Sequence, residues 1–399
     1  MADVARGKFG ATGCRAKFRS ASCSPPTRGE HVRLSCLAVG LLMLATAAAH
    51  AEEASPTPTG AQNSDYAAIV QRTISGYIVP AYQRLLIATT NLTKATDAYC
   101  AGPGEESKAA FTAAFAETVQ AWAGVDFLRF GPMAREGRFE RFSFWPDVHG
   151  TGARQLRQML SAEDASLLQP GGLDRQSAAV QGFPALESLM FLPDKGVLAS
   201  NSESPYRCSL ALAVARNMNT IAALALAGWT GSESWAALME KPGASNPVYA
   251  TSSEAMTEIL KAILTGIEQD RDLKIQPALG KTEAEAQPGR APFPLAGQTL
   301  PYLRGSIQAL KSFIDTSEVL MLLPASEQTI VSSYEAGFRA LADTLDSAGD
   351  DFKAAIVEPD SRVKLAQLPD TLASLRDLFH YKLFPTLGLS AGFNALDGD

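Results

Sequence analysis

Histidine is scarce in this sequence. The 399 residues contain four histidines, and His31 and His50 lie in an N-terminal segment that we expect to be removed. The other two, His149 and His380, are far apart in the chain. A zinc hydrolase usually needs two or three imidazole ligands and a base for the metal-bound water. The composition therefore argues against a zinc enzyme of that kind, and an oxygen-only site for a harder cation is the alternative.

Alternating strand patterns of useful length are also absent. Apolar residues instead recur at spacings of three and four along four segments, which is typical of amphipathic helices. These segments are 105–130, 306–323, 327–345 and 362–381. The pattern predicts an all-α fold built from several bundle-forming helices.

Long apolar, charge-free runs are confined to the N-terminus. Residues 37–49 read LAVGLLMLATAAA, seven Lys and Arg residues precede them, and Ala49-His50-Ala51 follows as a small-x-small cleavage site. This order is typical of a secretory signal peptide, so we assign residues 1–51 to one, with a retained anchor as the alternative. Residues 52–63 are rich in Pro, Ser and Thr and predict a flexible tether before an ordered region that begins near Ser64.

The predicted mature chain is acidic. The whole sequence has a net charge of −7, and the signal segment holds seven basic and two acidic residues, so removing it leaves a net charge of about −12. Such a charge disfavours nucleic acid and anionic membrane surfaces as partners. We expect no membrane span in the mature chain, and we place the protein in the periplasm or cell envelope.

Cysteine is nearly as rare as histidine. Of the five cysteines, only Cys100 and Cys208 lie beyond the signal segment. Two cysteines in an oxidising compartment predict one disulfide, and two separate buried thiols are the alternative.

Five segments together resemble the imelysin-like family. They are YIVPAYQRLLIATTNL (77–92), LRFGP with RFSFWPD (128–132 and 141–147), QGFPALESLMF (181–191), PYLRGSIQAL (301–310) and LGLSAGFNALDGD (387–399). The resemblance implies an all-α fold of two helical-bundle halves, 64–245 and 246–399, that form a cleft. It also implies an envelope location and a link to metal or iron uptake, and some relatives were classed as metallopeptidases.

The family signature, Gly-x-His-x-x-Glu, corresponds here to Gly182, Pro184 and Glu187. In the signature, His and Glu three residues apart share a helix face and can ligate one metal. Proline offers no ligand atom, so the implied metal site is incomplete and only Glu187 remains as a weak metal ligand. Alternatively, Pro184 begins a helix over 184–192 and Glu187 is a first-turn residue that complements the helix dipole.

Other cleft candidates come from the long loop and the second half. Arg141, Trp145 and Asp147 lie in the loop, where Arg141 and Asp147 are available as a pair or as contacts for an anion or another ligand. Arg304 and Ser306 precede a predicted helix, although Ser306 is also a candidate helix cap. Asn394, Asp397 and Asp399 lie in the tail, where such residues also close turns. An oxygen-only metal site would draw on Glu187, Asp147, Asp397 or Asp399.

The sequence thus predicts a periplasmic protein that binds a ligand, such as a metal ion or an iron-containing complex, between two helical halves without catalysis. A divalent metal or iron is the candidate cofactor. A small ligand or an envelope protein is the candidate partner. A metallopeptidase and a structural partner in an envelope complex are the alternatives.

Overall fold

The computed structural model describes residues 60–192, 197–198 and 205–390. The predicted signal peptide, residues 52–59 of the predicted tether, and the tail candidates Asn394, Asp397 and Asp399 lie outside these residues. The first helix begins at Gly60, slightly before the expected start near Ser64.

Helices make up most of the described chain, which confirms the predicted all-α fold. The helices are α1 (Gly60–Thr73), α2 (Val79–Ala101), α3 (Glu105–Ala123), α4 (Arg138–Phe142), α5 (Thr151–Ala162), α6 (Phe183–Met190), α7 (Pro205–Trp229), α8 (Trp235–Glu240), α9 (Ser252–Glu268), α10 (Gln276–Leu279), α11 (Thr299–Ser317), α12 (Gln328–Ser347), α13 (Phe352–Ala355), α14 (Pro359–Leu365), α15 (Leu368–Leu378) and α16 (Phe384–Thr386).

Short elements interrupt these helices. Three π-helical turns, in which the backbone bonds span one extra residue, are η1 (Ile74–Ile78), η5 (Gln269–Ile275) and η10 (Phe379–Leu383). The strands described are β1 (Phe191–Leu192) and β2 (Val197–Leu198), which pair antiparallel with Phe191 opposite Leu198.

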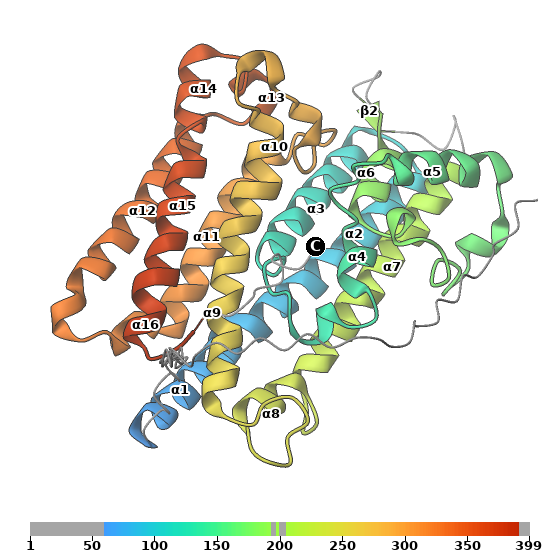
Figure 1. Cartoon of the computed structure of the whole chain (residues 1–399). Helices are drawn as coiled ribbons and strands as arrows, with labels where there is room; N and C mark the ends of the chain where they lie inside the picture. The colour runs from blue at the N-terminus through green and yellow to red at the C-terminus, as the bar shows by residue number, and fades with distance from the viewer. Residues whose placement is uncertain (1–59, 193–196, 199–204, 391–399) are drawn as a thin grey trace, which may run out of the picture. The chain divides into compact units, whose positions relative to one another are not determined.

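The helices pack in two groups. Helix α2 lies between α3 and α7, while α9, α11, α12 and α15 run side by side in the second group (Figure 1). Helix α1 comes first in the sequence, yet it packs against α9 and α11, and α3 also packs against α11. Helix α1 therefore belongs with the later helices in its packing. The division of the chain at residue 245 stays a prediction.

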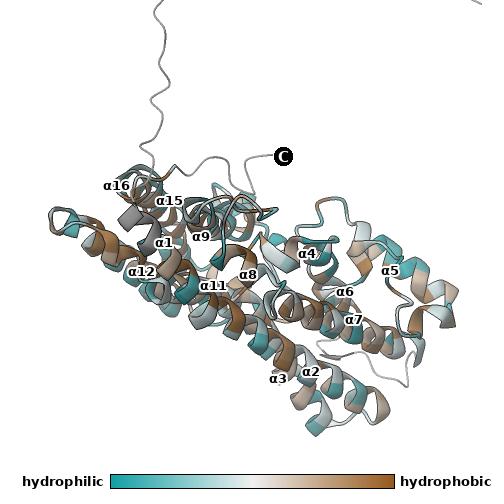
Figure 2. Ribbon diagram, turned by 90° about the horizontal axis from the view of Figure 1, so that it is seen from below, coloured by the Kyte–Doolittle hydropathy of each residue, from teal (hydrophilic) through white to brown (hydrophobic). Residues whose placement is uncertain are grey.

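Amphipathic faces explain this packing. In α12, the predicted stripe of Ile330, Tyr334, Phe338, Leu341 and Leu345 is buried throughout. Helix α12 has both hydrophobic and hydrophilic residues along its length, and so does α5 (Figure 2). Removing such side chains from water is the main force that holds the helices against each other.

Three of the predicted helical segments have other bounds in the structure. The segment expected at 105–130 is α3, which ends earlier, at Ala123. The helix expected at 306–323 is α11, which begins at Thr299 with Pro301 in its first turn, where a missing N–H costs nothing. It ends at Ser317, and Met321, which lies within the segment expected to be helical, is 80% exposed. The helix expected at 362–381 divides into α14 and α15, because Pro369 begins the second helix and cannot continue the first.

One described helix, α7, is long and apolar enough to cross a membrane by length and composition alone. This differs from the expectation that no such run follows the signal segment. Its apolar side chains are largely buried against α2 and α6, so the helix has a place in the core of the bundle.

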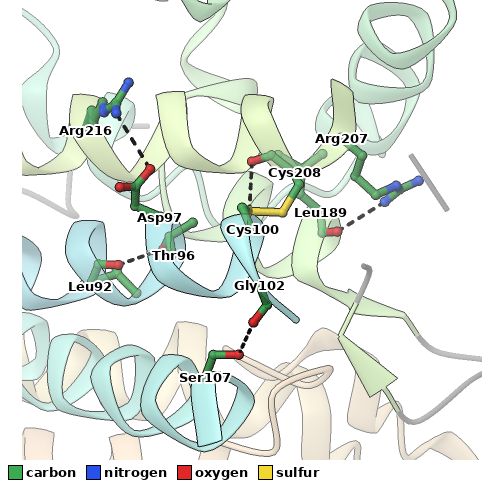
Figure 3. Close-up of a disulfide and its surroundings, with 10 residues drawn as sticks. All are labelled: Leu92, Thr96, Asp97, Cys100, Gly102, Ser107, Leu189, Arg207, Cys208 and Arg216. Carbon is green, nitrogen blue, oxygen red and sulfur yellow. Dashed lines mark hydrogen bonds and ion pairs between the residues drawn. A yellow bond between two sulfur atoms is a disulfide. The ribbon is translucent and has the colours of Figure 1, made fainter. Parts of the chain in front are cut away.

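A disulfide joins Cys100 at the end of α2 to Cys208 in the first turns of α7, as predicted (Figure 3). The two Cα atoms are 5.7 Å apart, and 108 residues separate the cysteines in the chain. Asp97 and Arg216 approach to 4.0 Å along the same pair of helices. The bond therefore closes a long loop over a helix pair that already packs face to face.

We expect Cys100→Ala with Cys208→Ala to lower the free energy of unfolding by about 2–5 kcal/mol, because the unfolded chain regains the entropy of a long loop. Urea unfolding measures the change. A reducing agent should lower the stability of the natural protein by a similar amount and leave the double variant unaffected. Equal stability of both proteins under oxidising conditions would contradict this role.

Candidate functional site

A cavity of about 500 Å³ lies where three segments meet. Residues 143–148 follow α4, residues 184–188 belong to α6, and residues 273–302 run from η5 into α11. Its walls are mainly proline, aromatic and aliphatic side chains, with a few polar groups among them. Concave sites of this size and character are typical of small-molecule binding.

Glu187 is the buried acid of this cavity. Its side chain is 5% exposed, and its Oε1 atom accepts hydrogen bonds from the backbone N–H groups of Leu295 (3.0 Å) and Ala296 (2.8 Å). The other oxygen, Oε2, has no hydrogen-bond partner within the described residues. One carboxylate thus joins α6 to a loop more than a hundred residues further along the chain, and one of its oxygens stays open to a ligand.

The loop that binds Glu187, residues 291–298, is held in an unusual conformation. Phe293 has φ of +56°, a left-handed region that aromatic residues rarely adopt. The Gln298 N–H donates to the Phe293 carbonyl (3.1 Å) and the Thr299 hydroxyl to the Pro292 carbonyl (2.7 Å), which closes the loop. Such strain persists only where surrounding contacts hold it, and it is common at binding sites.

Burial controls the ionisation of Glu187. Removal from water raises the pKa of this carboxyl to about 7, and the N–H groups of Ala296 and Leu295 oppose the rise only partly. The group therefore exchanges its proton near neutral pH. A carboxyl with this property in a cavity is a candidate for ligand binding or proton transfer.

The start of α6 explains why the signature residues lie here. Pro184 occupies the first turn of α6, as predicted, and it lines the cavity. Gly182 lies so close to the preceding segment that a Cβ atom would be 2.0 Å from the Phe142 carbonyl oxygen, which requires glycine. Glu187 is beyond the first turn, so its alternative role as a dipole-complementing first-turn residue was wrong.

The loop candidates divide between cavity and scaffold. Trp145 and Asp147 line the cavity, and the Trp145–Pro146 peptide is cis. Both carboxylate oxygens of Asp147 accept N–H groups at the start of α5, from Thr151 (2.9 Å) and Gly152 (2.7 Å).

Arg141 is not a cavity residue. Its guanidinium donates to the side-chain oxygen of Gln181 (2.7 Å) and pairs with Asp174 (3.0 Å). The anticipated pair with Asp147 was wrong, because the capping N–H groups already satisfy both oxygens of that carboxylate.

The two candidates on α11 also lie away from the cavity. Arg304 pairs with Asp346 (3.4 Å) in the last turn of α12 and with Asp350 (2.8 Å) just after that helix. Ser306 is buried inside α11, so the interpretation as a helix cap was wrong. Its hydroxyl bonds to Asp270 (2.8 Å) and accepts from Lys274 (2.9 Å).

Those contacts belong to a buried charge network that the sequence analysis missed. The Lys274 ammonium lies 2.7 Å from the Asp126 carboxylate and 2.8 Å from that of Asp270, and all three side chains are nearly inaccessible. The Tyr302 hydroxyl donates to Asp126. Because Tyr302 also lines the cavity, the network supports one of its walls.

The network fixes the charge state of Lys274. Burial alone would lower the pKa of this ammonium, but Asp126 and Asp270 outweigh burial and raise it above its ordinary value. Asp270 and Lys274 both lie in η5, and π-helical turns are frequent at functional sites. The available signal in the sequence was a lysine between two apolar residues, Leu273 and Ile275, four positions after an acid.

The described residues around the cavity do not fit a resident metal ion. No group of three or more His, Cys, Asp and Glu side chains in the described part of the chain is placed to hold one. Around the cavity, Pro184 has no ligand atom, Asp147 is committed to backbone N–H groups, and one oxygen of Glu187 is engaged.

Comparison with known proteins finds similarity to imelysin and imelysin-like proteins. The family model described as Imelysin matches residues 78–379. The structure of an imelysin-like protein from Psychrobacter arcticum superposes with a TM-score of 0.68 at 19% identity, covering 85% of this chain and 100% of that one. An iron-regulated protein A precursor from Parabacteroides distasonis gives 0.61 at 16% identity, covering 82% and 97%. The search of curated proteins found no match.

We expect Lys274→Met to lower the free energy of unfolding by about 3–5 kcal/mol, because two buried carboxylates would lose their cation. Lys311→Met is the matched control, since Lys311 also contacts two acids, Asp315 (2.8 Å) and Glu335 (3.4 Å), but near the surface. The control should cost at most about 1 kcal/mol. Chemical denaturation compares them, and equal costs would refute the network's role.

Glu187→Gln should change how stability depends on pH. The folded pKa, about 7, lies above the ordinary value of 4.5, so the folded state holds a proton that the unfolded state has lost between these values. Stability of the natural protein therefore falls as pH rises from about 4.5 to 7, by about 3 kcal/mol for this group.

Glutamine can accept the same two N–H groups and does not titrate. The stability of Glu187→Gln relative to the natural protein should therefore increase between pH 5 and pH 8 by up to about 3 kcal/mol. Thermal or urea unfolding at both pH values measures this difference, in which other titrating groups cancel. A difference independent of pH would show that Glu187 titrates normally.

Proposed function

Because this chain belongs to the imelysin family, we propose that it is an exported protein that binds a small ligand in the cavity around Glu187 and does not cleave peptides. The observation that carries the proposal is the state of Glu187. It is buried in a mainly apolar cavity, with one oxygen held by a loop from a distant part of the chain and the other without a partner in the described residues.

The energetic cost of this carboxyl supports a binding role. A charged carboxylate in this position destabilises the protein above pH 7, because burial disfavours its ionised form. Residues that lower stability in a cavity are commonly explained by what they do for a ligand. A hydrogen-bonding or positively charged group of the ligand would replace the interactions with water that the carboxylate loses on burial.

The donor set favours an organic ligand, or a metal carried within an organic complex, over a bare metal ion. A bare divalent ion requires several converging oxygen or nitrogen atoms, and the cavity offers one free carboxylate oxygen. An iron-containing complex is one ligand of this kind. The name of the Parabacteroides relative refers to iron regulation.

The same residues give little support for catalysis. Ser143 and Ser188 line the cavity, but within the described residues neither side chain is hydrogen-bonded to a general base. An activated nucleophile needs such a base within hydrogen-bond reach. Glu187 alone supplies a titrating group without a second group to complete the chemistry.

The proposed location is the periplasm. The signal-like residues 1–51 and the disulfide between Cys100 and Cys208 support export into an oxidising compartment. Mass spectrometry of the exported protein should give a chain that begins near Glu52. Retention of residues 1–51 would contradict this placement.

Pro184→His tests the relation between binding and metal chemistry. The variant restores an imidazole three residues before Glu187, so zinc binding should become tighter by on the order of tenfold or more. Calorimetric titration with zinc measures the change. Pro184→Ala controls for loss of the proline, and Pro184→His with Glu187→Gln should lose most of the gain.

The natural protein should show no peptidase activity with or without added zinc, measured on unfolded protein substrates. Metal-dependent cleavage that disappears in Glu187→Gln would overturn the binding proposal in favour of a metallopeptidase. Tight stoichiometric zinc binding by the natural protein would show that further ligands complete the site.

A further inference from the structure

We propose that the ligand held by this cavity is a small organic cation with an apolar body, bound by the open oxygen of Glu187 and the face of Trp145. This inference rests on the proposed function, because it names the chemical class of the ligand for the same cavity. It follows from the charge of the lining groups, their supply of hydrogen-bond donors and the aromatic wall.

The charges inside the cavity favour a cation. Three ionisable side chains with a formal charge line it: Glu187, Asp147 and Arg290. Arg290 is exposed at the outer edge, and Asp147 spends both oxygens on the N–H groups of Thr151 and Gly152. Glu187 is the buried one and keeps Oε2 without a partner in the described chain, so the open charge within the cavity is negative.

The backbone of the wall is poor in free hydrogen-bond donors, so an anion would depend on the side chains of Ser143, Ser188, Trp145 and the exposed Arg290. Five of the lining residues are prolines, which have no backbone N–H: Pro146, Pro184, Pro277, Pro292 and Pro294. The N–H groups of Leu295 and Ala296 are already directed at Glu187. Those of Arg290 and Ala291 bond to the carbonyls of Gln287 (2.9 Å) and Pro288 (3.2 Å).

Burying an anion with few hydrogen-bond donors around it is unfavourable in free energy. A cation is instead stabilised by hydrogen-bond acceptors and by the faces of aromatic rings. Trp145 is half-buried at the cavity, and no other ring in the described part of the chain packs against it. Tryptophan is the best aromatic partner for a cation. Phe293 and Tyr302 pack against each other with ring centroids 4.9 Å apart and supply an apolar surface for the ligand body.

Three probes of nearly equal shape test the charge preference: phenethylammonium, 2-phenylethanol and phenylacetate. Isothermal titration calorimetry with the exported mature protein at pH 8 should give the tightest binding for the cation. We expect phenethylammonium to bind at least about tenfold more tightly than the alcohol, and phenylacetate most weakly.

Variants assign the preference to residues. Glu187→Gln should remove most of the difference in affinity between the cation and the alcohol. Trp145→Leu should weaken binding of the cation several-fold. Glu258→Gln is the matched control, because Glu258 is a partly buried glutamate outside the cavity, and it should leave all three affinities unchanged.

The outcomes separate this inference from the proposed function. If the alcohol or phenylacetate binds as tightly as the cation, and Glu187→Gln or Trp145→Leu still weakens binding, the cavity remains a ligand site but the charge class is wrong. If the cation binds best but equally well to Glu187→Gln, the assignment to Glu187 is overturned. If none of the three binds at millimolar concentrations, both proposals fail.

Discussion

The carboxylate of Glu187 connects two parts of the chain that are far apart in sequence. It accepts the N–H groups of Leu295 and Ala296, and thereby holds the loop of residues 291–298 against α6. That loop places Phe293 and its neighbouring prolines on one wall of the cavity, opposite the residues that follow α4. This junction forms part of the cavity wall, and burial of the carboxyl there raises its pKa to about 7.

The surrounding structure holds this junction from two sides. Gly182 allows the start of α6 to lie directly on the Phe142 carbonyl, which aims Pro184 and Glu187 at the cavity. On the other side, Tyr302 is anchored through Asp126 to the buried Lys274. Buried ionic groups are a weak source of net stability, since desolvation offsets their attraction, but breaking one is costly. We interpret this network as a device that fixes the position of the Tyr302 wall.

The sequence predicted the helical fold and part of the site, each for a definite physical reason. Periodic apolar residues such as those of α12 report burial directly, and Pro184 reports a helix start. Glu187, Trp145 and Asp147, which come from the motif and the loop, line the same cavity, while their role as a site stays a prediction. Arg304 and Ser306 were misplaced, because the start of α11 had been set too late, after Pro301 instead of around it.

Tertiary contacts explain the remaining differences. Lys274 and its two acids are not recognisable as one cluster in the sequence, because Asp126 comes from the segment after α3 and the packing of η5 against its neighbouring helices buries all three. The left-handed Phe293 has no local signal, since Gly or Asn would be expected there.

The most direct test of the buried Glu187 carboxyl is an NMR titration of its carboxyl carbon in the ligand-free protein, with the signal assigned by means of Glu187→Gln. Our account predicts a midpoint near 7, and a midpoint near the ordinary value of 4.5 would contradict it.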